Sequence, residues 1–482
     1  MEYTSTRSSA LRASGAEAIV QGLAPDGGLF VPREFPQIDY RTLAEKPYPQ
    51  AAAQIVGAFL PEYSADFLRA AAGEAYASFG SKAGALRPVE PGFSALELWH
   101  GPTSAFKDYA LQLMPKLLVE GKRLLGRTET TKILVATSGD TGKAALAGYA
   151  GLPGIKIAVF YPDHGTSEVQ RLQMATQAGD NVAVFAVRGN FDDAQTGVKR
   201  AFGSKELAAA LAARQERLSS ANSINWGRLV PQIVYYFTAY NQSVRCGAVR
   251  DGEPVDFCVP TGNFGDILAG YYAKCMGLPV GKLLCASNQN DVLTQFLRTG
   301  VYDARRPFYK TASPSMDILV SSNLERLLYH VTEDAAQVAA WMGELAQNGW
   351  YQVPAPIMEQ IRETFGCGSA ADEEAAQELR RVFETTGYLM DPHTAVAWRV
   401  ARLAQPQHPC VVLSTADPYK FPASVLTALG ETPDADEFAA MHRLEMLSRT
   451  QAPAALAGLR QQPVRFAEVL TPNEIEAAAL SF

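Results

Sequence analysis

Short apolar runs alternate with helical patterns along most of the chain. The runs of strand length lie at residues 133–136, 155–160, 182–187, 255–259, 283–286 and 410–413, and most of them precede apolar residues at helical spacing. Strands that alternate with helices form right-handed crossovers and mostly parallel sheets. The pattern therefore predicts an α/β fold, in which ligands bind at the carboxyl ends of the strands.

The N-terminal residues do not continue this alternation. They contain one strand-like run and three helical patterns, at residues 29–31, 16–22, 50–60 and 64–78. The Gly- and Pro-rich residues 80–92 are expected to form a connector. We therefore predict an N-terminal accessory domain over residues 1–93, which shows no chemistry of its own.

Residues 331–386 also depart from the alternation, because nearly all of them have a helical pattern. Helices commonly end at a glycine in the left-handed conformation, so Gly387 is expected to close this region. The chain contains no internal repeat, low-complexity tract or long charge run.

The composition is that of a globular protein with a small-molecule ligand. The 482 residues allow two or three domains, and 47% are hydrophobic and 19% charged. A net charge of -7 disfavours nucleic acid or an anionic membrane as a partner. No apolar run is long enough to span a bilayer, and the first residues lack a signal-peptide pattern, so we expect a cytoplasmic protein.

The cysteines and histidines do not indicate a metal site. The six cysteines form no CxxC pair, and several lie in apolar runs, as is typical of buried free thiols. The six histidines form no HExxH motif and no mixed cluster with cysteine. We therefore expect no metal.

Lys107 occupies an unusual position for a cation. A Gly-Pro break precedes it, and helical spacing begins two residues after it, so Lys107 is predicted at a helix start. Thr103 or Ser104 could cap this helix. Because a helix start disfavours a cation, a lysine there among apolar neighbours tends toward a lowered pKa and a nucleophilic amine. The alternative is an ordinary lysine with a packed stem and a solvated head.

Two strand-to-helix turns are rich in glycine and small polar residues. Thr261-Gly-Asn-Phe-Gly-Asp266 follows the strand at 255–259, and Thr137-Ser-Gly-Asp-Thr-Gly142 follows the strand at 133–136. Backbone N–H groups at such turns can bind a phosphate or a carboxylate at the helix start. Neither turn is a Walker loop or a GxGxxG motif. The alternatives are an ordinary tight turn in the first case and a helix cap at Asp140 in the second.

Two further groups of polar residues give weaker indications. In the segment Ser414–Phe421, after the last strand, a hydroxyl can hydrogen-bond a buried heteroatom and Lys420 can bind an anion. Polar residues at 313–323 and 222–228, Arg228 among them, could bind a phosphorylated substrate. By composition alone, hydrogen-bonded loops explain the second group better.

A reactive lysine and at least two anion-binding turns fit one class of chemistry. The combination favours a cofactor that forms a Schiff base with the lysine and carries a phosphate. It also favours an amino-acid substrate with a carboxylate and a second anionic group. Residue types and spacing lead no further than this class.

The stretch His100-Gly-Pro-Thr-Ser-Ala-Phe-Lys-Asp-Tyr-Ala-Leu-Gln112 resembles the cofactor-lysine motif of the threonine synthases, in their longer bacterial and fungal form. Further blocks resemble that family in order and spacing, namely Tyr3–Arg7, Gly22–Pro32, Thr137–Gly142, Asn222–Trp226, Pro260–Asp266, Pro314–Ile318 and Ser321–Leu328. Each block is moderately specific, and together they cover nearly the whole chain.

The resemblance implies a fold type II pyridoxal-phosphate enzyme with two tryptophan-synthase-β-like α/β domains. We predict a large cofactor domain over residues 94–115 and 235–482 and a small domain over residues 116–234. The implied reaction converts O-phospho-L-homoserine and water to L-threonine and phosphate by γ-elimination and β-hydration. A monomer or a homodimer is expected.

The resemblance also implies roles for individual residues. Lys107 would form the Schiff base with pyridoxal 5'-phosphate and transfer protons. The cofactor phosphate would be bound by Gly262, Asn263, Phe264, Gly265 and Asp266, with Asp140 on the ring side and Thr415 at the pyridine nitrogen. The substrate carboxylate would be bound by Ser138, Gly139, Thr141 and Gly142. Ligands of the substrate phosphate are expected among Asn225, Arg228, Ser315 and Lys420.

One residue departs from the family pattern, and two rival functions stay open. The family commonly has a histidine where this chain has Asp417, which would put negative charge near the pyridine nitrogen or the substrate phosphate. The first rival is another fold type II lyase, such as a serine or threonine dehydratase, which needs no second anion site. The second is a non-catalytic member that binds a phosphorylated ligand.

Overall fold

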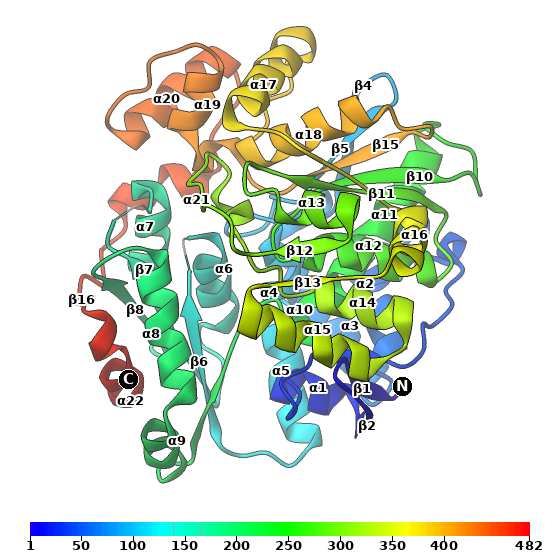
Figure 1. Ribbon diagram of the computed structural model, residues 1–482. Coiled ribbons are helices and arrows are strands. Elements are labelled where there is room, and N and C mark those ends of the chain that lie inside the picture. The colour runs from blue at the N-terminus through cyan, green and yellow to red at the C-terminus, as the bar shows by residue number, and fades with distance from the viewer. Residues whose placement is uncertain (138, 165) are drawn as a thin grey trace.

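The computed structural model describes residues 1–137, 139–164 and 166–482. Two sheets form the centre of the molecule, with the smaller at the left of Figure 1 and the larger at the upper right. Helices cover both faces of each sheet (Figure 1). The predicted α/β fold with mostly parallel sheets is therefore confirmed.

The larger sheet has six strands in the order β14-β11-β10-β15-β5-β4. In chain order these are β4 Ala85–Glu90, β5 Phe93–Glu97, β10 Val255–Pro260, β11 Val280–Ser287, β14 Phe365–Ser369 and β15 Cys410–Ser414. All neighbours are parallel except β4, which is antiparallel to β5. Residues of β10 alternate between two cores: Phe257 packs in one that includes helix α12 (Gly265–Cys275), and Cys258 in one that includes α18 (Pro392–Ala404). A strand buried on both faces reads as a continuous apolar run.

The smaller sheet has five parallel strands in the order β16-β8-β7-β6-β9. They are β6 Thr130–Ala136, β7 Ile155–Pro162, β8 Val182–Val187, β9 Glu216–Ser219 and β16 Val469–Leu470. Helix α6 (Asp140–Tyr149) follows β6, and α7 (Glu168–Ala175) follows β7. The last helix, α22 (Ile475–Ser481), packs against α8 (Phe191–Gly203) beside the same sheet.

The N-terminal residues form an antiparallel sheet of β1 (Tyr3–Ser5), β2 (Ser8–Ala13) and β3 (Phe30–Pro32), with helices α1 (Gly15–Gln21), α2 (Tyr48–Phe59) and α3 (Ala65–Tyr76). The three helices agree with the predicted patterns. Helix α1 starts at a capping box, in which Ser14 accepts from the Glu17 N–H and Glu17 accepts from the Ser14 N–H. The hairpin of β1 and β2 had not been predicted.

Two predicted regions differ from the structure. The expected connector at 80–92 contains β4, and the expected all-helical region at 331–386 contains β13 (Trp350–Gln352) and β14 beside helices α15 (Ala335–Asn348), α16 (Ala355–Thr364) and α17 (Asp372–Thr386). Gly387 does end that region, with φ of 70°. Both β4 and β14 are edge strands. Their secondary structure comes from a neighbouring strand rather than from a local apolar run.

The sheets also divide the chain differently from the predicted domains at two points. Strand β4 lies within residues 1–93 but belongs to the larger sheet, and β16 lies within 235–482 but belongs to the smaller sheet. Among the described residues, no helix has the length and apolarity needed to cross a membrane.

Candidate active site

Lys107 is the first residue of helix α4 (Lys107–Leu111), as the sequence predicted. Its Nζ lies 3.1 Å from Ser315 Oγ and 3.7 Å from Asp140 Oδ2, and its side chain is only 11% exposed. Burial lowers the Lys107 pKa; the Asp140 carboxylate opposes this effect, while nearby Lys420 and Arg228 add to it. A depressed pKa increases the fraction of neutral, nucleophilic amine at physiological pH.

The turn before Lys107 is held by Asp108 and not by the predicted cap. Within the part of the chain that the structure describes, helix α4 has no side-chain cap. Instead, Asp108 accepts from the Thr103 N–H at 2.8 Å and from Thr103 Oγ1 at 2.7 Å. Ser104 adopts the left-handed conformation, with φ of 61°. In an ordinary cap the residue before the helix accepts the hydrogen bond, whereas here Thr103 donates and Asp108, inside the helix, accepts. These two bonds close the turn and fix where Lys107 enters the site.

The loop after β15 is hydrogen-bonded to this turn. The Phe106 N–H donates to the Thr415 carbonyl at 2.8 Å, and the Asp417 N–H donates to the Ser104 carbonyl at 3.1 Å. Thr415 as a whole is only 6% exposed. The loop predicted to meet the cofactor nitrogen therefore lies directly against the segment that carries the lysine.

Lys420 and Asp140 form a buried ion pair at the same place. Lys420 Nζ lies 2.6 Å from Asp140 Oδ1 and donates to the Thr103 carbonyl at 3.0 Å. Gln170 Nε2 donates to the same Asp140 oxygen at 3.0 Å. Burial raises the Asp140 pKa, but the ammonium groups of Lys420 and Lys107 outweigh it and hold the pKa well below its usual range. Asp140 is therefore an ionised partner of two lysines and not a helix cap.

The glycine-rich turn at 261–266 joins β10 to α12. Phe264 is the N-cap of α12 in the left-handed conformation, with φ of 62°, and no side chain of the described residues caps the helix. Gly262 lies so close to the Ser315 loop that an added Cβ would be 2.6 Å from the Ser315 carbonyl oxygen. Uncapped N–H groups at a helix start, with no Cβ at Gly262, fit a bound phosphate group. Asn263 is exposed at this turn.

Asp266 closes the same turn from within the fold. Its Oδ1 accepts from Tyr235 at 2.6 Å and from Tyr236 at 3.2 Å. Burial raises the Asp266 pKa to about 7, although the two tyrosines and Lys107 act in the opposite direction. A carboxyl group with a pKa of about 7 is less ionised near neutral pH than an ordinary one, so it would repel a phosphate at this turn less strongly.

The turn at 137–142 joins β6 to α6. Thr137 Oγ1 accepts from the N–H groups of Gly139 and Gly142, each at 3.0 Å. Gly142 is buried and Thr141 is partly buried at the start of α6. Ser138, predicted to bind the substrate carboxylate, lies outside the described residues.

The backbone of Ser315 is hydrogen-bonded to His393, a residue that the sequence did not indicate as part of the site. The Ser315 N–H donates to His393 Nε2 at 3.1 Å, and His393 Nδ1 lies 2.7 Å from Asp391 Oδ1. Both residues of the pair are buried. These partners assign the proton to Nδ1 and leave Nε2 as the acceptor. The only sequence signal was Asp391-Pro-His-Thr394, which is also a typical helix start.

The other predicted phosphate ligands differ in their surroundings. Asn225 is buried; its Oδ1 caps helix α10 (Trp226–Leu229) and its Nδ2 donates to the Ile19 carbonyl at 2.9 Å. Arg228 is also buried and donates to the Ala221 carbonyl, while its Nε lacks a hydrogen-bond partner among the described residues. Burial lowers the Arg228 pKa to about 10. Asn225 is thus engaged in the fold, whereas Arg228 keeps a free donor.

Asp417, the departure from the family pattern, is a local cap. Its Oδ1 accepts from the Tyr419 N–H at 2.8 Å, at the start of the short helix Pro418–Lys420. Burial raises the Asp417 pKa to about 7. The Asp417 carboxyl group therefore has a structural role, which is to stabilise the loop after β15.

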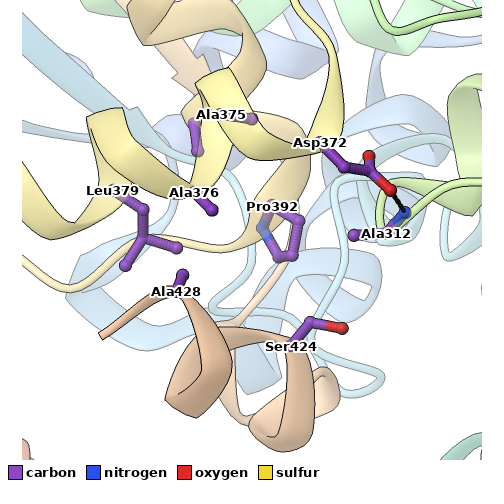
Figure 2. Close-up of a pocket in the computed structure, with 9 residues that line it drawn as sticks. Ala312, Asp372, Ala375, Ala376, Leu379, Pro392, Ser424 and Ala428 are labelled. Carbon is purple, nitrogen blue, oxygen red and sulfur yellow. Dashed lines mark hydrogen bonds between the residues drawn. The ribbon is translucent and has the colours of Figure 1, made fainter. Parts of the chain in front are cut away.

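A separate cavity beside this region is too small for a substrate. It has a volume of about 30 Å³ and lies between α17, α18, α19 (Pro422–Ala428) and the segment before Ser315, so it has room for only a few water molecules. Figure 2 shows Asp372 at its rim, accepting a hydrogen bond from the Ala312 N–H at 3.0 Å. Among the described residues, no group of three His, Cys, Asp or Glu side chains could hold a metal ion.

A buried lysine at a helix start, with glycine-rich turns after the parallel strands β6 and β10, is the arrangement expected of a pyridoxal-phosphate enzyme of the α/β class. Residues 93–355 match the family model "Pyridoxal-phosphate dependent enzyme". Residues 2–76 match "Threonine synthase N terminus", and residues 394–479 match "Threonine synthase, C-terminal". The chain belongs to the threonine synthase family, which confirms the resemblance.

Individual relatives agree with this assignment. Threonine synthase of Pseudomonas aeruginosa is 40% identical over 442 residues, covering 90% of this chain and 92% of that protein. The crystal structure of pyridoxal-phosphate-bound threonine synthase from Brucella melitensis has a TM-score of 0.89 and 39% identity, with 100% of this chain and 99% of that chain covered. Human threonine synthase-like 1 is 40% identical over 437 residues, and the match spans only 58% of its length.

Proposed function

We propose that this chain is a pyridoxal-phosphate-dependent threonine synthase, which converts O-phospho-L-homoserine and water to L-threonine and phosphate. The observation that carries the proposal is the position of Lys107 Nζ, which lies 3.1 Å from Ser315 Oγ and 3.7 Å from Oδ2 of Asp140, the first residue of helix α6. A nucleophilic amine and separate anion sites are what this substrate and cofactor require.

The chain offers a holder for each part of the cofactor. Lys107 would carry it, and the N–H groups around Gly262, Asn263, Phe264, Gly265 and Asp266 would bind its phosphate. Thr415 would meet the ring nitrogen, and Asp140 would lie on the ring side. When bound, pyridoxal phosphate supplies an electron sink for the carbanion chemistry at the amino acid.

Lys107 would then transfer protons as well as bind. Its depressed pKa favours the neutral form of the amine, which can accept the Cα proton, and Ser315 Oγ beside it orients the amine. The ion pair of Asp140 with Lys420 keeps the surrounding charge nearly balanced while the lysine changes its protonation state.

The two anionic groups of the substrate have different candidate sites. The start of α6, with Ser138, Gly139, Thr141 and Gly142, is the candidate site for the carboxylate, which would have to compete with Thr137 Oγ1 for the N–H groups of Gly139 and Gly142. Arg228 suits the phosphate, because it is a buried cation with an unpartnered Nε among the described residues. Ser315 is a further candidate. Lys420 is less suited, since its ammonium group is taken up by Asp140 and Thr103.

We further propose a cytoplasmic enzyme that acts as a monomer or a homodimer. The net charge of -7 argues against nucleic acid as a partner. The predicted domains, with the cofactor between the large and small α/β domains, remain part of this proposal.

The decisive experiment incubates the purified protein with O-phospho-L-homoserine and measures phosphate and threonine together. We expect equal amounts of both, and a yellow protein whose borohydride-reduced adduct maps to Lys107. Lys107→Ala should lower turnover by at least about 10³-fold, while Lys116→Ala, which removes a partly buried lysine paired with Glu74, should not. No release of phosphate from O-phospho-L-homoserine, together with release of a keto acid from serine or threonine, would instead favour a dehydratase, and a colourless protein would favour a non-catalytic binder.

A further inference from the structure

The two N-terminal sequence blocks have no role in the proposed chemistry, yet they converge on two adjacent residues of helix α14 (Leu324–Thr332). Arg7 donates from Nε and Nη2 to the two carboxylate oxygens of Glu325, at 2.8 Å in each case, and Thr6 Oγ1 also donates to Glu325. The Phe30 carbonyl accepts from Arg326 Nε at 3.0 Å. The first block thus holds Glu325, and the second holds Arg326.

The N-terminal sheet fixes these groups in place. Thr6 and Leu29 exchange two hydrogen bonds, from the Thr6 N–H to the Leu29 carbonyl at 2.9 Å and from the Leu29 N–H to Thr6 Oγ1 at 2.8 Å. Asp26 accepts from Ser5 Oγ at 2.8 Å and from the Gly28 N–H at 2.9 Å. The two blocks therefore form one rigid unit that presents Thr6, Arg7 and Phe30 to α14.

Arg326 connects the N-terminal sheet to residues in the interior of the molecule. Its guanidinium is fully buried and donates to Asn323 Oδ1 and, at 2.6 Å, to the Ile224 carbonyl, in addition to Phe30. Burial lowers the Arg326 pKa to about 10. One side chain thus joins three segments that are distant in sequence, and each contact orders the others.

Asn323 reaches the glycine-rich turn directly. Its backbone N–H and its Nδ2 both donate to the Asn263 carbonyl, at 3.1 Å and 3.0 Å. Asn263 immediately precedes Phe264, the N-cap of α12. Two hydrogen bonds to a single carbonyl oxygen define the orientation of the peptide plane that leads into the uncapped N–H groups.

We propose that the N-terminal domain is a positioning device for the cofactor-phosphate turn. Arg7, Glu325 and Arg326 would be positioning residues that act through Asn323 on the Asn263 carbonyl, and so aim the N–H groups of the turn at the phosphate. The inference rests on the proposed function, because it needs the turn at 261–266 to bind that phosphate. It predicts that substitutions in the N-terminal domain weaken binding of the cofactor phosphate and leave binding of the cofactor ring unchanged.

The test compares pyridoxal phosphate with pyridoxal, which has the same ring and aldehyde but lacks the phosphate. The full chain is stripped of cofactor and titrated with each compound while the absorbance of the lysine adduct is followed. We expect Arg7→Met and Glu325→Gln each to weaken pyridoxal phosphate binding roughly tenfold, within the range typical of coupling between sites. Binding of pyridoxal should change less than about twofold. The double variant should lose no more than either single variant, because both remove one ion pair.

Arg12→Met is the matched control, since Arg12 lies in the same sheet but forms a half-exposed ion pair with Glu2. It should bind both compounds like the unaltered protein. Equal weakening of both compounds by Arg7→Met, or no weakening of either, would overturn the inference. Failure of the unaltered protein to prefer pyridoxal phosphate over pyridoxal would instead overturn the assignment of the turn, and with it the inference.

Discussion

Lys420 Nζ lies 2.6 Å from Asp140 Oδ1, and neither side chain is more than 3% exposed. Such a pair contributes little net stability, but the loss of one partner leaves a buried charge at a cost of about 3–5 kcal/mol. Lys107, 3.7 Å from the other Asp140 oxygen, would remain as a second cation. Each of the two buried charges therefore depends on the other, and the pair sets the electrostatic environment of Lys107.

We predict that Lys420→Met lowers the free energy of unfolding by about 3 kcal/mol, the lower end of that range. It should also raise the Lys107 pKa, because the Lys420 ammonium contributes to its depression. Cofactor adduct formation would then require higher pH. Urea unfolding and the pH dependence of the adduct absorbance measure the two effects. The double variant Lys420→Met/Asp140→Asn removes both charges and should recover much of the stability; a double variant less stable than the single one would contradict this account.

The second prediction concerns Asp266, whose pKa burial raises to about 7. A carboxyl group with a raised folded-state pKa contributes stability that is fully present below the unfolded-state pKa, near 4, and is lost as the pH rises through about 7. Asp266→Asn stays neutral and keeps an acceptor for Tyr235. The variant should therefore gain roughly 3 kcal/mol relative to the unaltered protein between pH 5 and pH 8, at 1.36 kcal/mol per pH unit below the folded pKa.

Denaturant unfolding of the cofactor-free protein at several pH values measures this difference. Asp417, with a pKa raised to about 7, and Asp108, with a pKa raised to about 6, titrate in the same window in both proteins. Their contributions cancel in the comparison. A difference that does not depend on pH would show that Asp266 is already ionised at pH 5.

The central strands could be predicted because strands that are buried on both faces form continuous apolar runs in the sequence. Strands β7, β8 and β10 have apolar residues on both faces, so a continuous run identifies them. Edge strands lack this signal. Strand β14, Phe-Gly-Cys-Gly-Ser, contains two glycines and is a strand because Phe365 to Ser369 pair with Leu283 to Ser287 of β11. Tertiary pairing of this kind overrides local propensity.

The site could be predicted where it follows strand ends, and not where it depends on distant partners. The turns after β6 and β10 stood out because glycine and hydroxyl residues interrupt apolar runs. The contact between His393 and Ser315 joins residues 78 positions apart, and Asp391 reads as an ordinary N-cap with a proline after it. Nothing in the local pattern separates that cap from a positioning role.

We predict that His393→Leu lowers kcat by about 10- to 100-fold with a smaller change in KM. The variant removes the acceptor of the Ser315 N–H, so the hydroxyl beside Lys107 loses its fixed position. His393→Gln supplies a neutral amide oxygen at a similar reach and should recover part of kcat. Steady-state kinetics with O-phospho-L-homoserine measure both constants. If the glutamine variant behaves like the leucine variant, the histidine acts through some property other than hydrogen-bond acceptance.

The last prediction tests the contact between the glycine-rich turn at 261–266 and the Ser315 loop. An added Cβ at Gly262 would lie 2.6 Å from the Ser315 carbonyl oxygen, which is backbone and cannot rotate away. Gly262→Ala should therefore lower the free energy of unfolding by about 1–3 kcal/mol, as overpacking does. It should also weaken pyridoxal phosphate binding, because the turn can relieve the clash only by moving. Gly73→Ala is the matched control: Gly73 lies inside α3 with nothing within 4 Å of an added Cβ, so the change should stabilise the protein by about 0.5–1 kcal/mol. Equal stability changes at both positions would mean that the two loops separate freely and do not form one site.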